Sequence, residues 1–103
     1  MSFLRAAGDK EVKPGQALRV ELDGRLIALV RTADGRLFAV DDTCTHEQES
    51  LSDGFVEEGW IECPRHGAQF DLESGRALTL PALEKLGTYE VKVEIGEIMV
   101  NIT

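Results

Sequence analysis

The sequence predicts an all-β fold, either a sandwich or a barrel, and three observations support that prediction. Short apolar segments recur along the chain, and glycine-containing turns separate most of them. In residues 89–95, apolar and charged residues alternate with the period of two that is typical of a strand. The chain has 103 residues, which fits one domain and not two. Its apolar fraction of 43% is enough for an ordinary core. We therefore expect a single β-domain spanning residues 1–103.

Three strands are expected in the first part of the chain, and two Asp-Gly pairs join them. An Asp-Gly pair between β-rich segments indicates a hairpin, because glycine readily adopts the positive φ that a type I′ turn requires. The pairs are Asp23-Gly24 and Asp34-Gly35, and the strands that they join are 17–22, 25–32 and 36–40.

Five further strands are expected downstream: 55–58, 60–63, 69–72, 88–94 and 97–102. In the strand 88–94, the charged residues Glu90, Lys92 and Glu94 alternate with apolar ones, so we expect one face of this strand to be solvated. Three aromatic side chains are expected to pack as core beneath the functional site: Phe55, Trp60 and Phe70.

Three stretches depart from the strand pattern. Residues 41–54 and 64–68 are polar and rich in turn residues, and functional residues concentrate in such loops. Residues 78–87, which include Pro81, are compatible with either a helical turn or a long loop.

Every cysteine and histidine of the chain lies in one of two short motifs. The first is Cys44-Thr45-His46, and the second is Cys63-Pro64-Arg65-His66-Gly67. Two thiolates and two imidazoles form a metal-ligand set. Zinc sites usually pair Cys with Cys and His with His, whereas each motif here supplies one ligand of each kind. This order suits a binuclear iron centre in which one iron takes both thiolates and the other takes both imidazoles. A zinc-stabilised binding module remains an alternative.

These motifs, spaced C-x-H-x₁₆-C-x₂-H, resemble those of the Rieske-type [2Fe–2S] ferredoxins of multicomponent bacterial aromatic-ring dioxygenase systems. The flanking segments SLSDG and CPRHGAQFDLESG match as well, and the resemblance covers essentially the whole chain. It implies an antiparallel β-sandwich of the Rieske type with a small cluster-binding subdomain, formed by two loops, at about residues 41–80. It also implies one [2Fe–2S] cluster, with Cys44 and Cys63 on the inner iron and His46 and His66 on the outer iron.

Two departures from the respiratory members of this family are informative. Those proteins carry an additional, disulfide-bonded Cys in each loop, and here Glu49 and Arg65 stand at those places, where an ion pair could replace the disulfide. They also carry a Ser and a Tyr whose hydroxyls donate toward the cluster, and here Ala68 and Phe70 replace them. Fewer donors stabilise the reduced cluster less, so we predict a potential near the low end of the Rieske range, about −150 mV.

No catalytic apparatus is expected in this chain. The cysteines and histidines are all used as ligands, which leaves none for a hydrolytic pair or a mononuclear iron site. No glycine-rich nucleotide fingerprint is present either. The resemblance therefore implies a one-electron carrier between a flavin-dependent reductase and a terminal Rieske non-haem iron oxygenase. The alternative is a small Rieske-like subunit of a reductase, such as an assimilatory nitrite reductase.

The net charge of −8 arises in residues 41–63, which hold eight Asp and Glu residues and no Lys or Arg; we call these residues the acidic segment. A chain this acidic lacks the basic surface that nucleic acids and anionic membranes require. We interpret the acidic segment as a collar that docks onto basic patches of the two partners through Glu47, Glu49 and Asp53.

Membrane insertion and secretion are not expected. The longest apolar run, residues 26–30, is too short to span a bilayer, and the first ten residues lack the apolar region of a secretory signal. We therefore expect a cytoplasmic protein, and a monomer.

Overall fold

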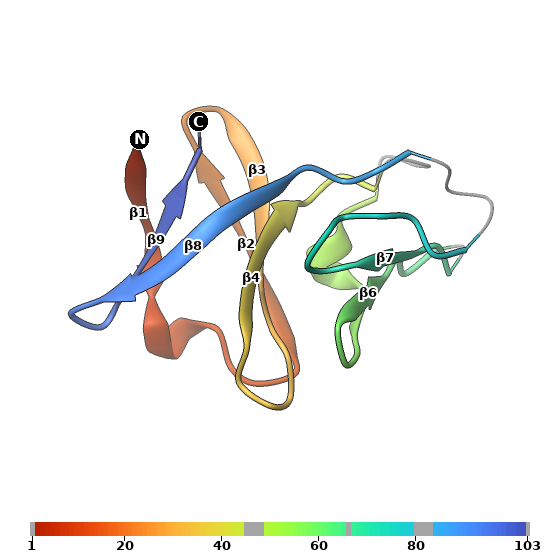
Figure 1. Cartoon of the computed structure of the whole chain (residues 1–103), viewed down its shortest axis with the longest axis horizontal. Helices are drawn as coiled ribbons and strands as arrows, with labels where there is room; N and C mark the ends of the chain where they lie inside the picture. The colour runs from red at the N-terminus through yellow and green to blue at the C-terminus, as the bar shows by residue number, and fades with distance from the viewer. Residues whose placement is uncertain (1, 45–48, 66, 80–83, 103) are drawn as a thin grey trace.

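The computed structural model describes residues 2–44, 49–65, 67–79 and 84–102 (Figure 1). Within these residues the regular secondary structure is almost entirely β, as predicted. The strands are β1 (Phe3–Gly8), β2 (Gln16–Leu22), β3 (Arg25–Arg31), β4 (Leu37–Asp41), β5 (Phe55–Val56), β6 (Trp60–Glu62), β7 (Gln69–Asp71), β8 (Thr88–Glu94) and β9 (Glu97–Asn101), with short 3₁₀ helices η1 (Asp9–Glu11) and η2 (Leu51–Asp53). No helix in this described part has the length and apolar character that crossing a membrane would take.

The larger sheet has six strands in the order β1-β9-β8-β4-β3-β2, and every pairing in it is antiparallel. Only two residue pairs join β4 to β8, so the sheet bends there into two three-stranded halves that face each other. Its two edge strands, β1 and β2, come into contact as a result. The start of β1 and the end of β9 lie side by side at one end of this curled sheet (Figure 1). The sandwich prediction is therefore confirmed.

A smaller antiparallel sheet, β5-β6-β7, lies at the other end of the molecule (Figure 1). It falls within residues 41–80, the range expected to form the cluster-binding subdomain, whose boundaries stay a prediction. The chain leaves the larger sheet at the end of β4 and returns to it at the start of β8. The smaller sheet and its loops are thus one long insertion between two paired strands.

Strand β3 separates two cores because both of its faces are buried. Ile27 and Leu29 point into the core between the two halves of the larger sheet, whereas Ala28 and Val30 point into a second core shared with the smaller sheet. The second core also contains Cys44 and Cys63. A strand buried on both faces reads as a continuous apolar run, as residues 26–30 do.

Strand β1 was not predicted. Its sequence, FLRAAG, has little β-propensity and no clean alternation. The strand forms because it pairs with β9, from Phe3 opposite Asn101 to Gly8 opposite Glu97, with a shift of register after Arg5. A pairing across almost the whole chain length leaves no local signal.

The two Asp-Gly hairpins differ from each other. At Asp23-Gly24 both residues have positive φ, 52° and 79°, as a type I′ turn requires. At the second pair only Gly35 has positive φ, 93°, and its N–H donates to the carbonyl of Thr32 at 2.9 Å. The prediction of a type I′ turn is therefore wrong for Asp34-Gly35, where a longer loop places glycine last.

Two apolar predictions are also corrected. Phe55, expected in the core, is 56% exposed, whereas Phe70 is fully buried and Trp60 is half-buried. In β8 the charged residues are exposed as predicted, but Val93 is exposed too, and Ile95 is fully exposed in the β8–β9 turn. The tip of this hairpin extends beyond the neighbouring strands of the larger sheet (Figure 1), which leaves these side chains uncovered. Of the undecided stretch 78–87, residues 80–83, including Pro81, lie outside the described residues, and the described remainder contains no helix.

Candidate metal centre

Cys44 and Cys63 lie in the same buried core and are 3% and 1% exposed. No disulfide joins these two cysteines, which are the whole cysteine complement of the chain. Their neighbours in the core are apolar, including Leu51, Ile61 and Phe70. A thiolate in such surroundings requires a compensating positive charge, which a bound metal supplies. The chemistry of this pair therefore fits the inner half of an iron–sulfur site.

Each cysteine opens a loop of the same length, closed by the cysteine's own amide. The N–H of Cys44 donates to the carbonyl of Glu49 at 3.0 Å, and the N–H of Cys63 donates to the carbonyl of Ala68 at 2.8 Å. In both cases the acceptor lies five residues further along the chain. The two segments so closed contain positions 46 and 66. The predicted ligands His46 and His66 themselves lie outside the described residues.

The second loop turns tightly at Gly67. This residue has a φ of 73°, in the left-handed region that favours glycine, and its N–H donates to the carbonyl of Cys63 at 3.2 Å. Ala68 and Phe70, which follow the turn, are fully buried and present no hydroxyl group to the core.

The first loop is held by Asp42, which is 1% exposed. Its carboxylate accepts hydrogen bonds from the Ser50 hydroxyl and from the N–H of Ser52 at 2.9 Å. Its backbone N–H donates to the carbonyl of Leu26 at 3.0 Å, and its carbonyl accepts from Leu51 at 2.6 Å. Asp42 therefore fastens both ends of the first loop to strand β3.

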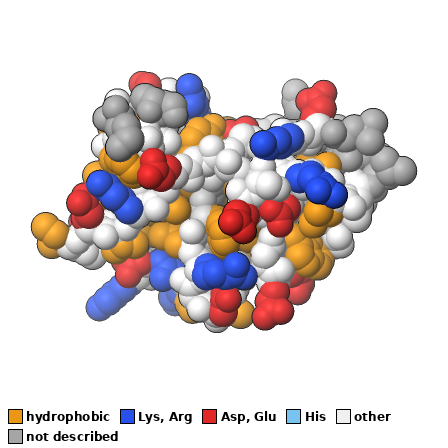
Figure 2. Space-filling view, in the orientation of Figure 1, with side chains coloured by type: hydrophobic (Ala, Val, Ile, Leu, Met, Phe, Trp, Pro, Cys, Tyr) orange, Lys and Arg blue, Asp and Glu red, His pale blue; other side chains and the backbone are white. Residues whose placement is uncertain are grey.

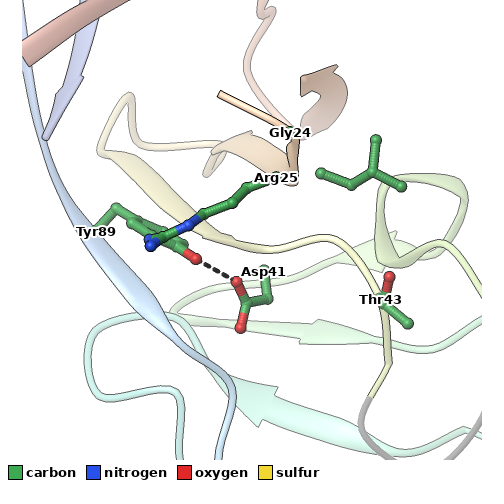
Figure 3. Close-up of a pocket in the computed structure, with 6 residues that line it drawn as sticks. Gly24, Arg25, Asp41, Thr43 and Tyr89 are labelled. Atoms are coloured by element: carbon green, nitrogen blue, oxygen red, sulfur yellow. Dashed lines mark hydrogen bonds between the residues drawn. The ribbon is translucent and has the colours of Figure 1, made fainter. Parts of the chain in front are cut away.

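Asp41 anchors the segment by which the chain returns to the larger sheet, at the start of strand β8 (Figure 3). Its carboxylate accepts from the Tyr89 hydroxyl and from the N–H of Gly87 at 2.9 Å, and its own N–H donates to the Gly87 carbonyl at 2.9 Å. A Cβ at position 87 would lie 2.6 Å from the Asp41 carboxylate. The two chain crossings between the sheets are thus joined at one point, beside an open cavity of about 390 Å³ that Arg25 and Thr43 also line.

The pKa of Tyr89 is raised above its usual value of 10.0. Burial disfavours the phenolate, and the hydrogen bond to the negatively charged Asp41 carboxylate raises the pKa further, while Arg25 opposes both effects. Tyr89 therefore stays a hydrogen-bond donor to Asp41 over the whole physiological pH range.

The ion pair expected between the two loops is present. Arg65 Nη1 donates to Glu49 Oε1 at 3.0 Å, with side-chain exposures of 63% for Arg65 and 33% for Glu49. The pair joins the residue that closes the first loop to the residue that precedes position 66. An ion pair between residues 49 and 65 was the contact expected in place of a disulfide.

The acidic segment divides into carboxylates with structural partners and carboxylates without them. Asp41, Asp42 and Glu49 make the contacts above, and Glu62 Oε1 accepts from Gln69 Nε2 at 3.0 Å. The remaining described carboxylates are exposed, namely Asp53, Glu57 and Glu58; Glu47 lies outside the described residues. On the face seen in Figure 2, acidic and basic side chains are interspersed. Sequence reasoning missed the anchoring roles of Asp41 and Asp42, because a run of carboxylates is usually a solvated surface.

Comparisons with known proteins agree with an iron–sulfur site in this chain. A model of the Rieske [2Fe–2S] domain family matches residues 2–90. The ferredoxin component of the naphthalene 1,2-dioxygenase system of Pseudomonas aeruginosa is 39% identical over 93 residues, which is 90% of this chain and 88% of that protein. The 3-phenylpropionate/cinnamic acid dioxygenase ferredoxin subunit of Shigella flexneri serotype 5b is 39% identical over 103 residues, 99% of this chain and 95% of that one.

Solved structures agree with these sequence relatives. The ferredoxin of Sphingomonas yanoikuyae B1 superimposes with a TM-score of 0.91 at 32% identity, covering 99% of this chain and 100% of that one. The ferredoxin in a complex of reduced oxygenase and oxidised ferredoxin of carbazole 1,9a-dioxygenase gives 0.86 at 36% identity, covering 95% and 91%. A Mycobacterium tuberculosis protein assigned as the small subunit of an NADH-dependent nitrite reductase gives 0.84 at 26% identity, covering 96% and 93%.

Proposed function

Because this chain belongs to the Rieske [2Fe–2S] domain family, we propose that it carries single electrons from a flavin-dependent reductase to a terminal Rieske non-haem iron oxygenase. The observation that carries this proposal is the pair of matched loops, each opened by a buried cysteine and closed by that cysteine's amide. Relatives of nearly the same length are named as ferredoxin components of dioxygenase systems, so the chain is an electron carrier and not the catalytic subunit.

The chain carries one Rieske-type [2Fe–2S] cluster. As ligands we propose Cys44 and Cys63 for the inner iron and His46 and His66 for the outer one. Two neutral imidazoles in place of thiolates leave the oxidised centre with a net charge near zero, which makes reduction easier than in four-cysteine clusters. The apolar core around Cys44 and Cys63 would keep water away from the cysteine side of the cluster. Electron exchange is then expected on the opposite side, where we propose the histidines.

The potential is expected near the low end of the Rieske range, about −150 mV. Ala68 and Phe70 are both fully buried beside the cysteines and supply no hydroxyl donor. The substitution Ala68→Ser tests this directly, because a serine hydroxyl at this position would stabilise the reduced state and raise the midpoint potential measured by voltammetry. A clearly positive potential in the unmodified protein would contradict the proposal.

Docking is proposed to depend on the acidic segment, including Glu47, Glu49 and Asp53. Three of its carboxylates hold the fold, through Tyr89, the serines and Gln69, and are less available to a partner. Among the described residues, this leaves the exposed carboxylates and the partly exposed Glu49 to steer association. Electron transfer to both partners should therefore slow as ionic strength rises.

A second candidate is the small subunit of a reductase such as an assimilatory nitrite reductase. The similarity to the Mycobacterium tuberculosis protein favours it, although that identity, 26%, is below the 39% shared with the dioxygenase ferredoxins. A zinc-stabilised module is not compatible with the cluster of this family. A carrier is expected to be a cytoplasmic monomer, whereas a reductase subunit is expected to copurify with its large subunit.

One set of measurements distinguishes these functions. The purified protein should show the visible absorption of a [2Fe–2S] cluster and, once reduced, the EPR signal of a Rieske centre. A flavin-dependent reductase should reduce the purified protein in stopped-flow mixing. A terminal oxygenase should turn over only when the purified protein is added. Reduction that occurs only within a stable complex with a nitrite reductase large subunit would favour the second candidate.

A further inference from the structure

The smaller sheet has one face that its core does not use. The register of β5, β6 and β7 places Phe55 opposite Glu62, and Glu62 opposite Gln69. The N–H of Leu78 donates to the carbonyl of Gln69 at 2.7 Å, which continues the row to Leu78. Residues directly opposed on antiparallel strands lie on the same face. Phe55, Glu62, Gln69 and Leu78 therefore form one row across the sheet; we call it the outer row.

The neighbouring row faces the opposite way, into the core. Val56, Ile61, Phe70 and Ala77 follow one another across the same strands, and all of them belong to or pack against the second core. Because side chains alternate along a strand, the outer row is directed to solvent. Its position does not depend on the placement of either histidine.

The two ends of the outer row are large apolar side chains with high exposure. Phe55 is 56% exposed and Leu78 is 44% exposed. Neither belongs to a core. Exposed apolar side chains gathered on one face and bordered by polar groups are typical of binding surfaces, and aromatic residues supply most of the binding energy in many of them.

The middle of the outer row connects it to the metal centre. Glu62 is hydrogen-bonded to Gln69, and the other oxygen of its carboxylate lies 3.9 Å from the position that a Cβ of Gly67 would occupy. Gly67 belongs to the loop that Cys63 opens, next to position 66. A protein that covers the outer row therefore also lies against the second cysteine loop.

The border of the row is acidic. Asp53 precedes β5, and Glu57 and Glu58 follow it directly; all three are exposed. Within the described part of the chain, none of the three takes part in an ion pair. The complementary surface is one with an apolar depression for Phe55 and lysine or arginine side chains around it.

We propose that the outer row, with Asp53, Glu57 and Glu58 at its border, is the docking surface for the terminal oxygenase. The inference rests on the proposed function and deepens it by naming the anchor residue, Phe55. The oxygenase is the occupant because a ferredoxin that superimposes on this chain at 36% identity forms a complex with its oxygenase. Phe55 and Leu78 supply apolar contact, and the carboxylates orient the encounter.

The test uses the cluster-loaded protein and the oxygenase whose turnover depends on it. Phe55→Ala should raise the ferredoxin KM of oxygenase turnover about fivefold or more, and Leu78→Ala about twofold, with kcat unchanged. The matched control is Ile95→Ala, which removes the most exposed apolar side chain from the β8–β9 turn of the larger sheet and should leave KM unchanged. The visible spectrum and thermal midpoint of each variant verify that the cluster and fold are intact.

The outcomes separate this inference from the proposed function. The inference is overturned if Phe55→Ala leaves the oxygenase KM within twofold of the unmodified value, or if its effect falls on reduction by the reductase instead. If the unmodified protein supports no oxygenase turnover at all, the proposed function is wrong. The proposed docking surface for the oxygenase is then wrong as well. Neutralising Glu57 and Glu58 together should reduce the salt dependence of the oxygenase step, and an unchanged dependence would count against the acidic border.

Discussion

The larger and the smaller sheet of this protein are stabilised in different ways. Strands β2 and β3 pair through seven consecutive residues, across a two-residue hairpin, and bury a continuous apolar run. Strand β5 has only two residues, and the smaller sheet depends on the Asp41 and Asp42 carboxylates, on close backbone contacts at glycines and on the two cysteine loops. The larger sheet is stable through its own backbone pairing and core. The smaller sheet, held by single polar contacts, is expected to lose stability when any one of them is removed.

The largest effect that this comparison predicts follows removal of the cluster. In Cys63→Ser, or after chelation of the iron, amide hydrogen exchange in β6 and β7 should accelerate by about tenfold or more, because metal binding is coupled to the folding of its loops. Exchange in β2 and β3 should change little and serves as the internal control. Equal acceleration in both sheets would show that the molecule unfolds as one unit and that the distinction between the sheets is wrong.

The next effect concerns two glycines with similar backbone conformations. Gly75, at φ 78°, would place a Cβ 2.2 Å from the Leu86 carbonyl, whereas Gly35, at φ 93°, has open space around it. Gly75→Ala should therefore lower the free energy of unfolding by about 3 kcal/mol or more, and Gly35→Ala by about 1 kcal/mol, which is the conformational cost alone.

Urea unfolding of the two variants measures this difference. Similar losses at both positions would mean that the return segment near Leu86 moves aside easily. In that case the smaller region would be less tightly packed than the contact at Gly75 indicates.

The comparison also explains which parts of the structure could be predicted from the sequence. Strands β2 and β3 were predicted within one residue, because both the hairpin turn and the apolar run are local signals. The two motifs that we propose as cluster ligands stand out in the sequence because cysteine and histidine occur nowhere else in the chain. Phe55 was placed in the core wrongly, because the pairing of β5 with β6 decides which face of a two-residue strand is buried.

The role of Asp41 and Asp42 could not be predicted for a related reason. A run of carboxylates is usually a solvated surface, and nothing in the sequence indicates that two of them accept hydrogen bonds from distant backbone and hydroxyl groups. Their donors lie on Ser52 and on Tyr89, and the latter is 48 residues away from Asp41. Long-range polar contacts of this kind become visible only once the strands are placed.

The contact between Asp41 and Tyr89 should have an intermediate effect. Tyr89→Phe removes the hydroxyl donor and should lower the free energy of unfolding by about 1 kcal/mol. Because the pKa of Tyr89 is raised in the folded state, its contribution is fully present below the usual tyrosine pKa of 10.0 and is lost as the pH rises through the higher folded value. Unfolding of the Tyr89→Phe variant should lack this alkaline decline.

The measurement is simple because Tyr89 is the single tyrosine of the chain. The difference in phenolate absorbance between the unmodified protein and Tyr89→Phe reports its titration directly. A midpoint at or below the ordinary value would show that the hydrogen bond to Asp41 does not persist in solution.

The smallest effect is expected at the ion pair between Glu49 and Arg65, although it spans the two cysteine loops. Both side chains retain contact with solvent, so the pair is screened and its coupling energy should be about 0.5 kcal/mol. A double-mutant cycle of Glu49→Gln and Arg65→Gln isolates this coupling, and the rate of cluster loss is the second readout. The coupling should disappear at high salt, unlike the effect of a covalent disulfide. A coupling above about 2 kcal/mol, or one insensitive to salt, would mean that the pair is a true structural clamp. The two loops would then resist separation without the cluster, and the contrast between a self-sufficient sheet and a dependent one would be weaker than the structure indicates.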